Sequence, residues 1–414
     1  MRRDATDTML TIRHLPRPEL GDVGAAEHLR LDARDSCRTL AAMLSVEEFI
    51  AAGIYDPETD ATTGRLELLQ WLEAKGFTLA EMVQGAADLS LGAMAGDRAL
   101  LPGRRLSGDE AAALAGISRV ELDGLVRAFG LTPISSAPAG EIGLTAAEAE
   151  MFGLFSAVAS AFSDDEATSF VRVIGSAFAR IGDAGVSLFL TDIESRLLVD
   201  GSSELVLAQA VEDAIGLVDD LAQQLDPLLR RHILQAIERS RRAMLSETER
   251  FRYRYAVGFV DLVGFTAISG EMDAPTLSAF LRDFEGRAHD VVTAAGARVV
   301  KLIGDEVMFA ADDPAAACVA ASELMSGFAA EHDHVLPRGG LAYGDVLVRG
   351  GDLYGPIVNL ASRLVDEAVP QELLVTTALA EATTACQFEP AGRRMVKGFD
   401  EPISVQSLRT VPPA

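Results

Sequence analysis

The spacing of apolar residues changes along the chain near residue 255. Before that point, Ser or Thr precedes Glu by three residues at six places, and each pair is followed by apolar residues at helical spacing. These pairs are Ser45/Glu48, Thr78/Glu81, Ser107/Glu110, Ser118/Glu121, Thr145/Glu148 and Ser163/Glu166. Such pairs can form capping boxes, in which two side chains satisfy free backbone N–H groups at a helix start. The six pairs predict an almost entirely helical region up to about residue 245.

One segment of this region has the pattern of a helix-turn-helix. In LSGDEAAALAGISRVELDGLVRAFGL, residues 106–131, Gly116 would lie in the turn and Ser118 would cap the second helix. The two interpretations are a DNA-recognition motif and a helical pair within a bundle. The second helix carries Arg119 and Arg127 but also two acidic residues, so it lacks the basic surface that DNA binding needs. We therefore favour the bundle.

A second segment of the helical region is rich in phenylalanine, with small residues between the rings. The phenylalanines are Phe152, Phe155, Phe162, Phe170, Phe178 and Phe189. Small residues let helices approach closely while the rings fill the space between them. The pattern predicts a helical core or a dimer interface, and the alternative is a pocket for an apolar ligand such as a fatty acid.

Residues 226–254 form the predicted link between two domains, a helical domain over 1–225 and a second domain over 255–414. A chain of 414 residues exceeds one ordinary core. The link begins with Pro227 at a plausible first helical position and is rich in Arg on its polar side. His232 is one of six histidines. The residues expected to face inward are Leu228, Leu229, Ile233, Ile237 and Met244.

After Tyr255, short apolar strands alternate with amphipathic helices. The order is strand, helix, strand, strand, helix, strand, which predicts an α+β sheet covered by helices. The chain is thus expected to be multidomain, with an all-α domain before this α+β domain.

Charge and composition limit the classes of partner that this chain can bind. The chain has 36 Lys and Arg residues against 62 Asp and Glu residues, so its net charge is -26, which disfavours binding to nucleic acid. An anionic substrate would need a local positive site or a bound metal. Cys37, Cys318 and Cys386 show no metal-ligand spacing, which favours a reducing cytosol. We expect no signal peptide and no transmembrane segment, and a cytoplasmic protein, with peripheral membrane association left open.

Two carboxylates stand out in the second domain. Asp261 ends the apolar strand of VGFVDLVGFTAIS, and Asp305 lies in the Gly-Asp turn of KLIGDEVMF. A buried carboxylate is costly unless it is paired or binds a metal, and two converging Asp could hold hard divalent cations. The backbone N–H groups of Gly264, Phe265 and Thr266 could face phosphate at the next helix start.

The segments GFVDLVGFTAIS, KLIGDEVMFA, YGDVLVRGGDLYGPIVNLASRL and MVKGF resemble the signature blocks of class III nucleotidyl cyclase catalytic domains, from about residue 255 to 408. The resemblance implies a ferredoxin-like α+β fold and an adenylate cyclase that converts ATP to cyclic AMP and pyrophosphate. It further implies two Mg²⁺ or Mn²⁺ ions per active site, held by Asp261, Asp305 and the backbone carbonyl of Leu262.

Other positions match the family one by one. The resemblance implies that Arg363 stabilises charge on the α-phosphate and that Asn359 orients the ribose, and the two lie four residues apart on one helix face. Lys301 and Asp352 match the pair that reads the purine. A Lys donor and an Asp acceptor complement N1 and N6 of adenine, which favours ATP over GTP. Lys397 matches a lysine that contacts the terminal phosphates.

In the family, the metal residues and the base-reading residues come from different copies, so a homodimer is implied. The first half resembles the helical regulatory domain of one actinobacterial group, which restrains the catalytic half, responds to acid pH and binds fatty acids. Two alternatives are a DNA-binding regulator that senses a nucleotide and a scaffold with an inactive cyclase fold. The acidic charge opposes the first, and the intact catalytic set opposes both.

Overall fold

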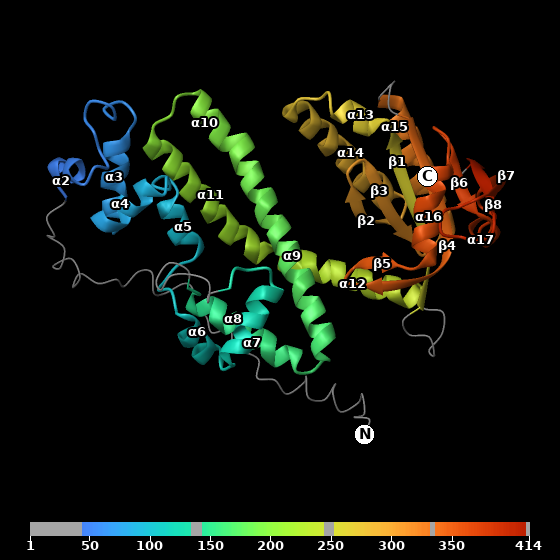
Figure 1. Ribbon diagram of the computed structural model, residues 1–414, viewed down its shortest axis with the longest axis horizontal. Helices are drawn as coiled ribbons and strands as arrows, with labels where there is room; N and C mark the ends of the chain where they lie inside the picture. The colour runs from blue at the N-terminus through green and yellow to red at the C-terminus, as the bar shows by residue number, and fades with distance from the viewer. Residues whose placement is uncertain (1–43, 134–142, 244–251, 332–335, 411–414) are drawn as a thin grey trace. The chain divides into compact units, whose positions relative to one another are not determined.

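The computed structural model describes residues 44–133, 143–243, 252–331 and 336–410 (Figure 1). The chain divides into two compact units, Met1–Asp226 and Pro227–Ala414. Cys37 and Met244 lie outside the described residues.

The first unit is helical, and its described part contains a single isolated β-bridge, between Leu106 and Leu144. Its helices are α2 (Val46–Ala51), α3 (Arg65–Ala74), α4 (Leu79–Ala87), α5 (Met94–Leu100), α6 (Gly108–Ala115), α7 (Arg119–Ala128), α8 (Ala146–Ala159), α9 (Asp164–Phe189), the π-helical turn η2 (Leu190–Glu194), α10 (Ser195–Val199) and α11 (Glu204–Gln224). The predicted all-α first domain is confirmed.

Four of the six predicted capping boxes form in full, at Ser45, Thr78, Ser107 and Thr145. Ser118 accepts the bond from the Glu121 N–H, but the Glu121 carboxylate accepts a bond from Ser156 instead of returning one. The prediction was wrong at Ser163, which caps α9 without a side-chain hydrogen bond. Three acidic residues in the first turn of α9 interact favourably with the helix dipole there.

The predicted helix-turn-helix is present as α6 and α7. Gly116 ends α6 with φ of 70°, a left-handed conformation that glycine adopts without strain. On α7, Arg119 forms ion pairs with Asp109 and Asp123 rather than standing free. Leu122 and Val126 of α7 are fully buried in a core shared with α8, as a bundle requires.

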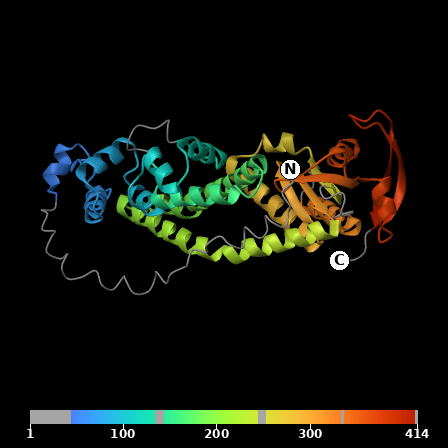
Figure 2. The same ribbon diagram turned by 90° about the horizontal axis from the view of Figure 1, so that it is seen from below.

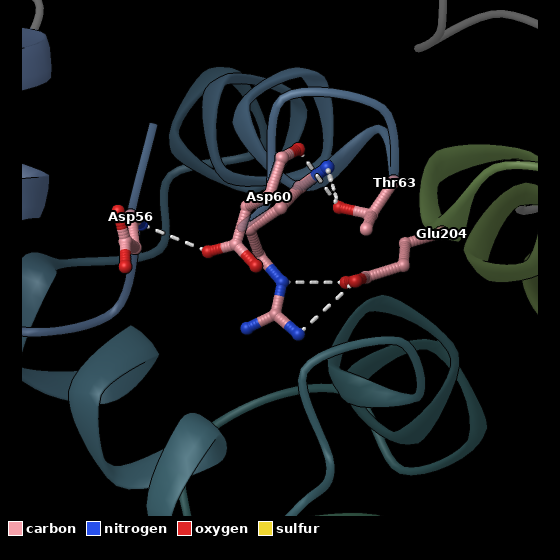
Figure 3. A network of polar contacts seen from close by, with 5 residues as sticks. Asp56, Asp60, Thr63 and Glu204 are labelled. Atoms are coloured by element: carbon pink, nitrogen blue, oxygen red, sulfur yellow. Dashed lines mark hydrogen bonds and ion pairs between the residues drawn. The ribbon is translucent and has the colours of Figure 1, made fainter. Parts of the chain in front are cut away.

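A polar network ties α3 to α11 at the other core of this unit (Figure 3). Arg65 Nε and Nη2 donate to the Glu204 carboxylate at 2.5 and 3.1 Å. In the preceding loop, the Asp56 N–H donates to Asp60 at 2.8 Å, and the Thr63 hydroxyl donates to the Asp60 carbonyl at 3.0 Å. These contacts fix the start of α3 against α11.

The phenylalanine-rich segment is only partly a core. Phe152 is fully buried, and Phe129 meets Phe152 and Phe155 edge to face. Phe162, Phe170 and Phe178 are 59–65% exposed. The helical stretch Asp164–Val199 has the length and apolar composition of a membrane span. The most apolar 18 residues of this stretch are only 6% buried. One such helix, identified by length and composition alone, is weak evidence for a span.

The second unit begins with α12 (Asp226–Ala243). The prediction that one face of this helix is buried was wrong for the single chain. The four residues expected to face inward are 42–60% exposed: Leu228, Leu229, Ile233 and Ile237. Hydrophobic periodicity identifies an apolar face, but it does not identify what covers that face.

The sheet of this unit follows the predicted strand and helix order. Its elements are β1 (Arg252–Val263), α13 (Phe265–Ser269), α14 (Ala274–Ala294), β2 (Arg298–Ile303), β3 (Glu306–Ala311), α15 (Pro314–Glu331), β4 (Leu336–Arg349), β5 (Asp352–Tyr354), α16 (Pro356–Glu367), β6 (Leu373–Thr376), α17 (Thr377–Ala382), β7 (Gln387–Arg394) and β8 (Ile403–Thr410). The spatial order is β2-β3-β1-β4-β6-β8-β7, with β5 paired to β4. Figure 2 shows the β7–β8 hairpin in red at one edge.

Alternating residues of β1 point to two different cores. Ala256, Val260 and Leu262 pack with α14, α15 and α17, whereas Val257 and Phe259 pack with α16. The backbone of α16 lies so close to β4 that a Cβ on Gly340 would come within 2.5 Å of the Ala361 carbonyl oxygen. The sheet is therefore sandwiched between helices, and its two-residue alternation follows from the strand geometry.

Candidate active site

Three charged residues form a row across three neighbouring strands. Asp261 of β1 is the direct cross-strand partner of Glu306 on β3 and of Arg338 on β4. Directly opposed residues project from the same face of an antiparallel sheet. Arg338 Nε and Nη2 both donate to Asp261 Oδ2, at 3.1 and 2.9 Å. The side chains of Asp261 and Arg338 are 20% and 25% exposed, so this ion pair is mostly desolvated.

Asp305 joins this row from the β2–β3 turn. Strand β3 lies between β1 and β2, so the strand that leads to Asp305 is not the direct neighbour of the strand that bears Asp261. The two carboxylates still come together, because the turn brings Asp305 next to Glu306, whose strand pairs with β1. Gly304 adopts φ of 64° in this turn, which a side chain would strain.

Burial and neighbouring charges raise the pKa of two carboxyl groups at this site. Burial, and then the charge of Asp261, raises the pKa of Asp305, although a backbone hydrogen bond and Arg338 oppose the shift. Burial, and then the charges of Asp261, Asp366 and Asp305, raises the pKa of Glu306 to about 7. Strongly shifted carboxyl groups beside a paired cation are typical of functional sites.

The proposed base readers form a direct ion pair. Lys301 Nζ on β2 lies 2.7 Å from Asp352 Oδ2 at the start of β5. Asp352 Oδ1 accepts from the Leu353 N–H at 2.8 Å, which fixes the carboxylate orientation. The two side chains are 42% and 26% exposed, so both remain accessible to a ligand. The structure therefore brings together a donor and an acceptor that the sequence motif places 51 residues apart.

Asn359 and Arg363 lie one turn apart on α16. The buried residues Leu360 and Leu364 hold the other side of this helix against the sheet. Asn359 is exposed, and Arg363 Nη1 donates to Asp366 at 3.2 Å. The Arg363 and Asp366 side chains are 42% and 57% exposed, so this pair contributes little to stability.

The remaining predicted residues have mixed positions. Gly264 precedes α13 with φ of 87°, while Phe265 is buried and stacks on Phe280 at 4.9 Å. Nothing is described of the Thr266 side chain. Leu262 is buried in β1, next to Asp261. Lys397 is exposed in the β7–β8 connection, next to Val396, which packs in the core beneath α16.

Sequence reasoning missed Arg338 and Glu306. Glu306 directly follows the turn aspartate, so proximity in the sequence could have suggested it. Arg338 lies 77 residues from Asp261, and only the strand register reveals that they are opposed.

The carboxylate pair suits a hard divalent cation. Among the described residues, no three His, Cys, Asp or Glu side chains form a metal-binding group. Mg²⁺ commonly takes one or two protein carboxylates and fills its other positions with water and substrate phosphate. Asp261 and Asp305 match that requirement, and their mutual repulsion would be relieved by a bound cation.

Comparison with known proteins identifies the family to which the chain is similar. Residues 252–407 match the adenylate and guanylate cyclase catalytic domain family. An adenylate cyclase of Streptomyces coelicolor is 33% identical over 290 residues, 70% of this chain and 74% of that protein. An uncharacterised protein of Mycobacterium tuberculosis is 30% identical over 371 residues, 90% of this chain and 96% of that protein. A pH-sensitive adenylate cyclase of Mycobacterium tuberculosis is 27% identical over 360 residues, 82% of this chain and 86% of that protein.

The similarity extends well beyond the catalytic segment, because the match to the uncharacterised mycobacterial protein covers nine tenths of the chain. The similarity to that protein therefore includes the helical first unit as well as the second. The chain belongs to the adenylate and guanylate cyclase family, and its second unit is the cyclase catalytic domain.

Proposed function

We propose that this protein converts ATP to 3′,5′-cyclic AMP and pyrophosphate at sites shared between two copies of the chain. One observation carries the proposal. A single domain contains both a carboxylate pair facing an arginine, at Asp261, Asp305 and Arg338, and a lysine–aspartate pair suited to adenine.

In this reaction the ribose 3′-oxygen attacks the α-phosphorus, the bond to pyrophosphate breaks, and the hydroxyl proton is lost. Two Mg²⁺ or Mn²⁺ ions held by Asp261, Asp305 and the Leu262 carbonyl would acidify the hydroxyl and neutralise the triphosphate. Arg363 would stabilise the charge that develops on the α-phosphate, and Asn359 would orient the ribose. Lys397 and the N–H groups of residues 264–266 would contact phosphate.

ATP is the proposed nucleotide because of hydrogen-bond complementarity. Lys301 donates and Asp352 accepts, which matches the N1 acceptor and the N6 donor of adenine. Guanine presents the reverse pattern at these positions. The names of the relatives from Streptomyces coelicolor and Mycobacterium tuberculosis support the same substrate.

The homodimer is supported by the surface around the site. Three large apolar side chains are each 49% exposed: Ile303, Leu347 and Tyr354. Ile303 lies between Lys301 and Asp305 in the sequence, and Leu347 pairs with Tyr354 across β4 and β5. Large apolar side chains that stay exposed beside site residues can mark an interface. A second copy would cover them and would complete each site with the opposite set of residues.

The shared site can be tested by complementation. Asp261→Ala should abolish cyclic AMP formation, because a carboxylate that would hold the cation is lost. Arg363→Ala should strongly reduce cyclic AMP formation. Mixing the two variants should restore activity, since one site of the heterodimer keeps both intact sets. Each variant mixed with itself is the control. Subunit exchange without any returning activity would contradict the shared site.

We further propose that the first unit inhibits the catalytic unit near neutral pH and releases it in acid. The similarity to a pH-sensitive adenylate cyclase over 82% of this chain supports this regulation. Helix α12 precedes β1, which bears Asp261, in the chain order of elements, and a shift in such a helix can separate half-sites. His232 is exposed on α12 and is one candidate for the titrating group.

The test compares the full chain with a chain beginning at Ser246, from about pH 5.5 to about pH 8. The shorter chain should be more active at neutral pH, and the difference should narrow in acid. Equal activity throughout this range would rule out autoinhibition while leaving the cyclase activity intact.

An apolar ligand such as a fatty acid is a separate proposal for the first unit. The cavity proposed for it has a volume of about 380 Å³ and apolar lining from Leu68, Leu91, Leu207 and Val211. None of the six phenylalanines of the phenylalanine-rich segment lines this cavity, so it is a different place from the one that the sequence pattern suggested. Arg65 also lines it, but its guanidinium is engaged by Glu204. A change in cyclase activity that saturates with fatty-acid concentration in the wild type, and that is absent in Leu207→Lys, would support this site.

A further inference from the structure

Strand β2 contacts the β4–β5 turn through its first residue. Arg298 Nη1 donates to the Gly351 carbonyl at 3.3 Å. Gly350 and Gly351 both have positive φ, 60° and 83°, and Arg349 pairs with Asp352 on either side of them. Two central residues with positive φ are the signature of a type I′ hairpin turn, which glycine tolerates and other residues do not. Asp352 follows this turn directly.

The same strand makes a second contact with β5. Lys301 lies three residues beyond Arg298 and pairs with Asp352 at 2.7 Å. Strand β5 has only three residues and pairs only with β4 among the described strands. Leu353 of this hairpin end is buried in the core, and the two β2 side chains contact the turn and the Asp352 carboxylate from the other strand. They therefore help to set where that carboxylate lies relative to the Lys301 ammonium.

Arg298 is half-buried, and charged groups of both signs surround it. Burial, and then the like charge of Arg239 on α12, lowers the pKa of the Arg298 guanidinium, while Tyr255 and Asp352 oppose the shift. A desolvated cation beside another cation is a cost to folding, and an apolar residue of similar size would avoid that cost.

We propose that Arg298 is a positioning residue, whose guanidinium holds the Gly350–Gly351 turn so that Asp352 and Lys301 present the correct acceptor and donor to the nucleobase. The inference rests on the proposed function of Lys301 and Asp352 as base readers. It adds a determinant of nucleotide affinity and selectivity that does not itself touch the nucleotide.

The test uses the full-length protein with Arg298→Met, Arg298→Lys and the control Arg282→Met. Arg282 is an exposed arginine on α14, in the same domain. The measurements are kcat and KM with Mn²⁺-ATP and with Mn²⁺-GTP, and the melting temperature. Loss of one charge-assisted hydrogen bond should raise KM for ATP about fivefold to tenfold in Arg298→Met and lower the preference for ATP over GTP.

The effects on kcat and on stability separate positioning from a structural role. We expect kcat to change less than KM, and the melting temperature of Arg298→Met to stay equal or rise, because burial of a charge is relieved. Arg298→Lys keeps the charge but loses the planar fork, so its KM should lie between those of the wild type and Arg298→Met. A lower melting temperature with unchanged KM and selectivity would assign Arg298 a structural role only and overturn the proposal.

Two further outcomes keep the inference distinct from the function on which it rests. Should Arg298→Met fail to fold, the Lys variant decides, and wild-type KM and selectivity there overturn the proposal. Lys301→Ala and Asp352→Ala are measured in parallel. If they leave base selectivity unchanged, the base-reading assignment fails; if they alter it while the Arg298 variants do not, only the positioning role fails.

Discussion

Replacing Arg338 with Met would remove the cation that the structure pairs with Asp261. Two N–H groups of Arg338 reach one carboxylate oxygen, and this carboxylate shares its surroundings with Asp305 and Glu306. Methionine keeps a long apolar side chain at the site, so loss of the charge dominates over loss of packing. The variant therefore leaves three neighbouring carboxyl groups without that counter-charge.

The expected loss of stability follows from the exposure of the pair. Removing one partner of a fully buried ion pair costs about 3–5 kcal/mol. Asp261 and Arg338 are 20% and 25% exposed, so solvent screening reduces this loss to about 2 kcal/mol. For a unit the size of residues 227–414, about 2 kcal/mol lowers the melting temperature by about 4–8 °C.

The assay is calorimetric unfolding of the full chain, first with a chelator and then with Mn²⁺. A cation bound by Asp261 and Asp305 replaces the missing charge, so Mn²⁺ should stabilise Arg338→Met more than it stabilises the wild type. Arg282→Met on α14 controls for loss of an exposed arginine. Equal melting temperatures of Arg338→Met and wild type in chelator, or equal shifts with Mn²⁺, would refute this account of the row.

Two further predictions concern neighbouring groups. The raised pKa of Glu306, about 7 against an ordinary 4.5, means that metal-free stability should fall as pH rises from about 4.5 to about 7. Glu306→Gln should flatten that part of the melting-temperature profile, and parallel profiles would contradict the shift. Arg363→Ala should lower kcat about 100-fold with a small change in KM, because this side chain acts on charge that develops in the transition state. A rise in KM at constant kcat would instead assign it to ground-state binding.

Local sequence patterns predicted the elements of this protein well, because caps and turns depend on neighbours in the chain. Four full capping boxes and the turn at Gly116 are examples. The failures depend on distant residues. The insertion of β3 between β1 and β2 and the pairing of Arg338 with Asp261 both depend on strand order and register. Whether the apolar face of α12 is buried depends on which other residues cover it, and hydrophobic periodicity does not contain that information.

The roles of the predicted site residues came from motif resemblance, and geometry adds constraints that a motif does not contain. Lys301 and Asp352 belong to separate motif segments, yet they meet at 2.7 Å because β2 runs beside the short β5. Composition could not have shown this meeting, since both residue types are common on any surface.

The row of charges also explains why an arginine stands among these carboxylates. Carboxylates close enough to share a divalent cation repel one another when that cation is absent, and burial strengthens the repulsion. Arg338 offsets part of this repulsion by pairing with Asp261. On the proposed mechanism, Asp261 would hold a cation with the same carboxylate that Arg338 contacts, and the Arg338 guanidinium would then be available to the triphosphate. Metal binding and recognition of the anionic substrate would then be coupled through one oxygen atom, Asp261 Oδ2, in a protein whose net charge of -26 otherwise repels ATP.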